Sequence, residues 1–375
     1  MKQFFMLAAT GILTIASLTA SAQFTVDGRA TAAEIGAGMG KYQLAATYTG
    51  THLEADRGLQ ALYVGYTATT LNIMLVGSVE AVNSTTASGG YRSLIVYLNT
   101  PARPGAPAGT ALPGGSDPQS PLKHHPTMDN PTDYGFRVSV GPASATANDV
   151  YFSRVSYVTG TAVTPGTDTF IAAGTKAGGQ AVAPGTLDLS GSKYAYNSTA
   201  SLTANTTNSG FELEIPLSCL GTATVPITTG TNIELVAAYT DGDGVFFSDV
   251  IPQITGRTTV LGSNPDFSAI PGNQFLTDAL GTGVLASRSA VATGFDFQVY
   301  PNPASTTSTI AYTVPAGRQP VSLAVYNALG QRVRSLANTE QAGNQQFALG
   351  SLPAGAYLVK LQIGDQLTSR KVVVQ

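Results

Sequence analysis

The sequence predicts an all-β protein in which a large β-sandwich is followed by a small one. Charged residues make up only 11% of the 375 residues, whereas average soluble proteins have roughly 25%. Glycine (41 residues) and proline (21 residues) together form about one sixth of the chain. Short runs rich in β-branched and aromatic residues alternate with Gly, Pro and Asn turns, which is the pattern of short strands. No long segment has the apolar repeat of a helix.

The chain begins with the pattern of an export signal. Lys2 is basic, residues 4–18 are apolar, and residues 20–22 read Ala-Ser-Ala. This order predicts a signal peptide over residues 1–22, with cleavage after Ala22. The apolar run is shorter than the roughly 20 residues that a membrane-spanning helix needs, so we expect no transmembrane anchor.

Residues 23–280 are expected to form the large β-sandwich, with Pro- and Gly-rich insertions, and residues 281–294 a linker. The apolar runs 61–66 and 71–77 are separated by four residues, which predicts a hairpin of adjacent strands. Further strand patterns follow at intervals of the length that a β-sandwich requires.

Two insertions interrupt these strand patterns. Eight prolines lie between residues 99 and 133, and because proline lacks the N–H that a strand donates, we expect a long surface loop there, partly mobile. Residues 159–191 are rich in Gly and Thr, and we expect them to contribute little to a core.

Few residues offer catalytic chemistry. Glu212 and Glu214 lie two apart on a predicted strand, so they share one face at roughly 7 Å, as a glycosidase pair could; a solvated strand face is the simpler interpretation. His124 and His125 could serve as ligands or bases, but without metal-site spacing they are interpreted as solvated loop residues. The single cysteine, Cys219, excludes an intramolecular disulfide and a Cys-based zinc site, and a buried apolar role is expected for it. We therefore expect no enzyme.

One acidic cluster resembles the start of a calcium loop. Asp241 and Asp243 alternate with glycines, and Asp249 follows, so these three carboxylates are candidate calcium ligands. The twelfth position is Pro252 rather than Glu, and an Asp-Gly hairpin turn explains the same residues. No other cofactor is expected, and a formal net charge of −3 gives no reason to expect nucleic acid as a partner.

The last eighty residues, 295–375, contain four motifs in a fixed order. They are Tyr-Pro-Asn-Pro-Ala at 300–304, Asn-Ala-Leu-Gly-Gln at 327–331, Leu-Pro-Ala-Gly-Ala-Tyr at 352–357, and a basic-then-apolar end at 370–375. Together they resemble the type A C-terminal sorting domain of the Bacteroidetes type IX secretion system. The resemblance implies a small immunoglobulin-like β-sandwich, the secretion machinery as partner, and export through the periplasm to the outer-membrane surface or the medium. The structural or recognition residues that it implies are Pro301, Asn302, Pro303, Gly330, Gly355 and Lys371.

The central region also resembles a known group. Val-Asp-Gly at 26–28, Leu-Tyr-Val at 62–64 and Gly-Phe-Glu-Leu-Glu-Ile-Pro-Leu at 210–217 are similar to the family-9 carbohydrate-binding-module or DOMON-like sandwich, a jelly-roll fold. This resemblance implies a non-catalytic binding module, with a polysaccharide or an envelope component as partner. The chain has no tryptophan, so tyrosine rings would have to stack on sugar. A structural or adhesive envelope protein and a secreted hydrolase are the alternative functions.

Overall fold

The structure is a computed structural model. It describes residues 24–55, 57–80, 90–142, 146–160, 163–185, 188–281, 283–285, 297–327, 332–363 and 366–374. The expected signal peptide and Gly330 lie outside these residues. The chain divides into two compact units, Met1–Leu285 and Ala286–Gln375.

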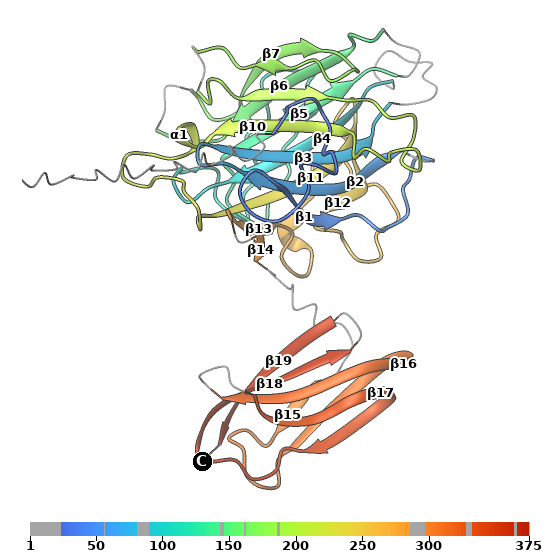
Figure 1. Ribbon diagram of the computed structural model, residues 1–375, viewed down its shortest axis with the longest axis vertical. Helices are drawn as coiled ribbons and strands as arrows, with labels where there is room; N and C mark the ends of the chain where they lie inside the picture. Colours follow the sequence, from blue (N-terminus) through green and yellow to red (C-terminus); the bar gives the residue numbers. More distant parts are fainter. Residues whose placement is uncertain are drawn as a thin grey trace, which may run out of the picture. The chain divides into compact units, whose positions relative to one another are not determined.

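The first unit is a sandwich of two antiparallel sheets, in which β2, β3 and β10 lie in one layer and β4, β5 and β11 in the other (Figure 1). The first sheet has the order β1-β2-β3-β10-β9-β8, formed by β1 (Tyr42–Thr47), β2 (Gly58–Tyr66), β3 (Thr70–Ser78), β10 (Gly210–Pro216), β9 (Lys193–Tyr196) and β8 (Ala181–Val182). The second has the order β14-β13-β11-β4-β5-β6-β7, formed by β14 (Gly283–Leu285), β13 (Leu276–Ala279), β11 (Asn232–Asp241), β4 (Arg92–Asn99), β5 (Tyr134–Val140), β6 (Val150–Ser156) and β7 (Thr167–Gly174), while β12 (Phe246–Ile251) also pairs with β11. The short helices are η1 (Pro121–Lys123), α1 (Leu217–Leu220) and η2 (Phe267–Ala269).

The main core lies between the two sheets. Leu62, Ile73 and Leu213 point inward from the first sheet, and Val96 and Phe136 do so from the second. The predicted hairpin is confirmed as β2 and β3, which pair over almost their whole length. The predicted all-β sandwich is therefore present. Strand β14 pairs with β13 inside the segment expected as a linker, so the first unit extends to Leu285.

The proline-rich segment 99–133 covers the outer face of the second sheet. Leu112, Leu122 and Met128 are buried against Ile95 and Tyr97, which point outward from β4. Backbone hydrogen bonds join the first part of the segment to its last part, for example between Ala106 and Thr132. A further one joins the segment to the carbonyl of Pro265. The segment is largely irregular and many of its residues are exposed, as expected of a surface loop. Its apolar residues between the prolines, however, bury a second face of the sheet, which was not expected.

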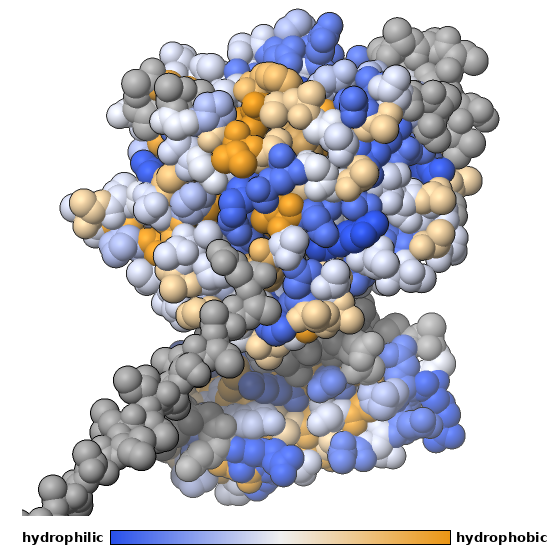
Figure 2. All heavy atoms as spheres, turned by 45° about the horizontal axis from the view of Figure 1, so that its top comes forward, coloured by the Kyte–Doolittle hydropathy of each residue, from blue (hydrophilic) through white to orange (hydrophobic). Residues whose placement is uncertain are grey.

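Residues 159–191 also contribute to the core, contrary to expectation. Strand β7 pairs with β6, and Ile171, Ala181 and Leu189 belong to the main core. The Thr- and Gly-rich composition of these residues gave no sign of a core contribution, because only alternate residues of an edge strand face inward. Two apolar side chains of this region, Phe170 and Val182, are exposed instead. On the face shown in Figure 2, apolar side chains form small clusters separated by hydrophilic ones.

The second unit contains β15 (Gln298–Tyr300), β16 (Thr309–Asn327), β17 (Arg332–Ala348), β18 (Gly355–Ile363) and β19 (Gln366–Val374). The strand order is β15-β16-β18-β19, with β17 also paired to β16. The long β16–β17 hairpin shifts register between Val314 and Gln319. Its two halves, represented by Ile310 and Leu323, share one core with Val359 from β18. The hairpin thereby supplies both faces of the small core.

Candidate functional site

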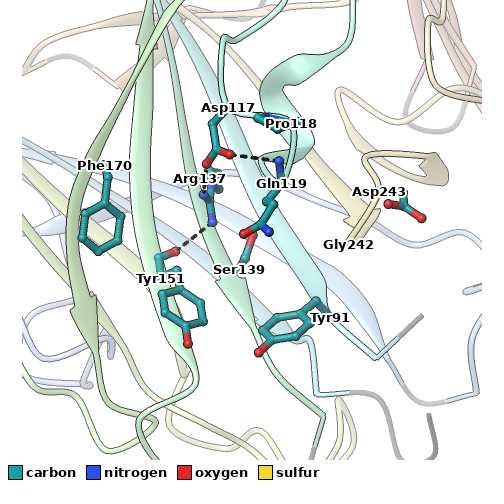
Figure 3. A pocket seen from close by; sticks show the side chains of 10 residues that line it. All are labelled: Tyr91, Asp117, Pro118, Gln119, Arg137, Ser139, Tyr151, Phe170, Gly242 and Asp243. Atoms are coloured by element: carbon teal, nitrogen blue, oxygen red, sulfur yellow. Dashed lines mark hydrogen bonds and ion pairs between the residues drawn. The ribbon is translucent and has the colours of Figure 1, made fainter. Parts of the chain in front are cut away.

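A groove of about 510 Å³ lies on the outer face of the second sheet (Figure 3). Its floor comes from β5 and β6, where Arg137, Ser139 and Tyr151 alternate with core residues that point to the opposite face. Residues 117–119 of the proline-rich segment and residues 242–243 of the β11–β12 turn also line it. The groove thus lies where the proline-rich segment leaves part of β5 and β6 uncovered.

Three aromatic side chains line the groove. The rings of Tyr91 and Tyr151 are 6.2 Å apart between centroids and inclined at 43°. Both are half-buried, while Phe170 from β7 is 58% exposed. The hydroxyl of Tyr151 donates to Oδ1 of Asp149 at 3.3 Å, which fixes the polar end of that ring. The three side chains thus give the groove an aromatic lining.

A buried arginine supplies the polar side of the groove. The side chain of Arg137 is 5% exposed, and its Nε donates to Ser153 Oγ at 2.8 Å. Its Nη1 donates to the Tyr151 carbonyl at 3.4 Å, and its Nη2 lies 3.7 Å from Oδ2 of Asp117. Burial lowers the pKa of Arg137, whereas the nearby Asp168 and Asp117 oppose that change. One edge of the guanidinium is anchored, and the other makes only long contacts.

The predicted carboxylate pair does not face solvent, so that interpretation was wrong. Glu212 is fully buried and Glu214 is 3% exposed. Glu214 contacts Lys193 Nζ at 2.7 Å and accepts from Asn72 Nδ2 at 3.1 Å. Both residues lie on one face of β10, as expected, but they are outside the groove.

The N-terminal segment covers Glu212. Oε2 of Glu212 accepts hydrogen bonds from the backbone N–H groups of Asp27 (2.8 Å) and Gly28 (2.7 Å), and Oε1 accepts one from the Tyr42 hydroxyl (2.7 Å). A Cβ at position 28 would lie 2.3 Å from the backbone nitrogen of Asn197, so only glycine permits this close approach. Burial raises the pKa of Glu212 to about 8, although these three donors act in the opposite direction.

The three candidate calcium ligands do not converge on one point. Oδ1 of Asp241 accepts hydrogen bonds from backbone N–H groups of its own turn, which is the hairpin turn between β11 and β12. Asp243 lies 3.7 Å from Lys123 Nζ, and Asp249 is buried beside Nδ1 of His52 at 2.5 Å. Among the residues that the structure describes, no group of three or more His, Cys, Asp or Glu side chains could hold a metal ion.

The two loop histidines and the cysteine occupy separate places. His124 is half-buried with Nε2 2.5 Å from the Asp243 carbonyl, so it is less solvated than expected. His125 is exposed, and its Nδ1 lies 2.9 Å from the Leu112 carbonyl. Cys219 lies in α1, packs against the main core and is only half-buried. None of the three lines the groove.

The motif residues at the two ends of the second unit meet. Nδ2 of Asn302 donates to the Lys371 carbonyl at 3.1 Å, and Oδ1 of Asn302 accepts from the Val373 N–H at 3.1 Å. The N–H of Ala304 donates to the Val373 carbonyl at 2.6 Å. The side chain of Asn302, between Pro301 and Pro303, thus ties the start of the unit to the backbone of β19. Gly355 begins β18 with φ +156°, a value that favours glycine.

Comparison with known proteins identifies the second unit. Residues 298–375 match the family model of the secretion system C-terminal sorting domain. The C-terminal unit is therefore a sorting domain of the type IX secretion system, as the motifs predicted, and it marks the chain for secretion or the cell surface. No curated protein matches the chain.

The solved structures with some similarity are distant. A biofilm-associated protein, BSP domain, is 10% identical with a TM-score of 0.17, and the match covers 94% of this chain and 53% of that one. Dimeric latent PorU from Porphyromonas gingivalis is also 10% identical with a TM-score of 0.19, covering 89% of this chain and 34% of that one. The chain thus spans about half or less of the structures that it matches.

Within the described residues, none of the helices has the length and apolar character needed to cross a membrane.

Proposed function

We propose that this type IX cargo is a secreted or surface-held glycan-binding protein. The sorting domain brings it out of the cell, and the groove of the first unit binds carbohydrate without cleaving it. The observation that carries the proposal is the set of aromatic rings, Tyr91, Tyr151 and Phe170, beside the polar pair Arg137 and Asp117 in one groove.

Sugar rings have apolar faces and polar edges, so they require both kinds of contact at once. Aromatic rings cover the apolar faces, and the two polar side chains and Gln119 can pair with hydroxyl groups. The groove volume of about 510 Å³ lies within the range of sites for small ligands. Tyrosine and phenylalanine supply the stacking surface in a chain that lacks tryptophan.

The positions of Glu212 and Glu214 argue against a hydrolase that uses this pair. Glu212 and Glu214, the pair that the sequence offered for glycosidase chemistry, are buried on the first sheet, while the groove lies on the second. A glycosidase needs two carboxyl groups flanking the bond that it breaks. These two cannot reach a sugar in the groove.

Binding of the mature chain to a panel of soluble polysaccharides, measured by affinity electrophoresis and calorimetry, tests the proposal. Tyr91→Ala and Tyr151→Ala should each weaken binding by about tenfold, since one lost stacking contact corresponds to roughly 1.4 kcal/mol. Tyr300→Ala, an exposed tyrosine of the sorting domain, is the matched control and should bind like wild type. Absence of saturable binding, together with retention in the envelope, would instead favour a structural role.

A further inference from the structure

We infer that Asp117 and Arg137 select adjacent hydroxyl groups of an uncharged sugar, and that the groove does not accept polyanionic chains. This inference rests on the proposed glycan-binding function and specifies its ligand. In this inference Arg137 and Asp117 determine which sugar binds, and the aromatic rings of the groove stack against it.

The arginine is positioned before any ligand arrives. Its Nε is fixed by Ser153 at 2.8 Å, and its side chain is 5% exposed, so it loses little freedom on binding. The Nη2 atom is 3.7 Å from Asp117, beyond the 2.7–3.2 Å typical of a hydrogen bond. Nη1 makes only a 3.4 Å contact, to the carbonyl of Tyr151. The donors of this edge thus lie beside the backbone of Tyr151, whose side chain also lines the groove.

Asp117 supplies the matching acceptor. Its Oδ1 accepts from the Gln119 N–H at 2.9 Å, which orients the carboxylate, and its side chain is 38% exposed. Figure 3 shows the carboxylate next to the Arg137 guanidinium at the groove. A hydroxyl group both donates and accepts. Two neighbouring hydroxyls can therefore reach this pair from the groove, one accepting from Arg137 and the other donating to Asp117.

The lining of the groove carries no excess of positive charge. Its lining contains one cationic side chain, Arg137, and two carboxylates, Asp117 and Asp243. Asp243 in turn lies 3.7 Å from Lys123. No excess positive charge remains to attract a carboxylated or sulfated chain, and Asp117 would repel an acidic group placed beside Arg137. The ligand is therefore an uncharged glycan.

The test compares two kinds of probe on the mature chain. Soluble β-glucan, mannan and arabinoxylan are the uncharged probes, and alginate and polygalacturonate are the polyanions. Asp117→Asn keeps the acceptor for the Gln119 N–H but places a donor against Arg137. We expect it to bind the uncharged probe at least about tenfold more weakly. Asp266→Asn is the matched control: Asp266 is exposed, lies outside the groove lining and also accepts a hydrogen bond from a backbone N–H, so this variant should stay within about twofold of wild type. Thermal melts of both variants should match wild type, because the side chain of Asp117 is more than one third exposed and Asp266 is exposed.

Each outcome has a distinct meaning. Weak dependence on salt between about 50 and 500 mM NaCl, together with selective loss in Asp117→Asn, supports the inference. Preference for a polyanion, or full binding by Asp117→Asn while Tyr151→Ala loses binding, overturns it and leaves glycan binding intact. Failure of wild type to bind any probe overturns both.

Discussion

Replacing Glu212 by glutamine tests how ionisation of this buried side chain affects the stability of the fold. The carboxyl group of Glu212 joins β10 to the N-terminal segment through the N–H groups of Asp27 and Gly28 and to the Tyr42 hydroxyl. Glutamine has the same shape, keeps an oxygen for the two N–H groups, and donates from its amide to the Tyr42 oxygen. It therefore reproduces the neutral form of Glu212 and cannot ionise.

The size of the effect follows from the pKa. Burial raises the pKa of Glu212 to about 8, against 4.5 for an unperturbed glutamate. Because the folded pKa is the higher one, the unfolded chain releases its proton first as the pH rises. Wild-type stability therefore decreases between about pH 4.5 and pH 8. Each pH unit in this interval corresponds to about 1.4 kcal/mol, so the loss between pH 5 and pH 8 is on the order of 4 kcal/mol.

Urea unfolding of the mature wild type and Glu212→Gln at several pH values provides the measurement. The two proteins should have equal stability near pH 5, and the variant should be the more stable by several kcal/mol near pH 8. Asp133 and Asp278, whose pKa values burial raises to about 6, titrate in both proteins and cancel in the difference. Glu340→Gln, at an exposed position on β17, should follow wild type. Equal slopes for wild type and Glu212→Gln would refute the reasoning.

Three further changes test other contacts. Asn302→Ala removes two hydrogen bonds to the edge of β19, so it should lower the stability of the sorting domain by about 1–2 kcal/mol and speed amide exchange at the end of β19; unchanged exchange would contradict this. Gly58→Ala places a Cβ 1.9 Å from Oδ2 of Asp249 at a residue with φ +137°, so its melting temperature should fall clearly; a wild-type melt would show that the contact is unimportant. Removal of residues 298–375 should leave the protein in the periplasm, and normal release of the truncated form would disprove the sorting role.

Local sequence patterns predicted the strands, the sandwich and the sorting motifs, but not which outer strand faces are covered by further chain segments. Alternation placed Glu212 and Glu214 on one face of β10 correctly. It did not reveal that residues 24–30, more than 180 positions away, cover that face. The Asp27-Gly28 turn was visible, and a glycine there is the one local sign of a close approach. Whether a strand face meets water or a second layer depends on distant chain segments, and alternation carries no information on that.

The groove could not be predicted for the same reason. Tyr91, Asp117, Arg137, Tyr151 and Phe170 come from five separate segments, and none lies in a motif. Each is unremarkable in its own segment, since single aromatic and charged residues are common on strands and loops. Only the pairing of β4, β5, β6 and β7 as neighbours brings four of these segments together.

The proline-rich segment links stability and binding in one stretch of chain. Its apolar residues Leu112, Leu122 and Met128 bury the outer face of the second sheet, which a two-layer sandwich alone would leave exposed. Between the first two of them, residues 117–119 turn polar side chains toward the groove. The prolines keep this segment irregular, because proline lacks the N–H that a strand donates. An irregular cover can therefore stabilise the sandwich and still leave part of β5 and β6 open to a ligand.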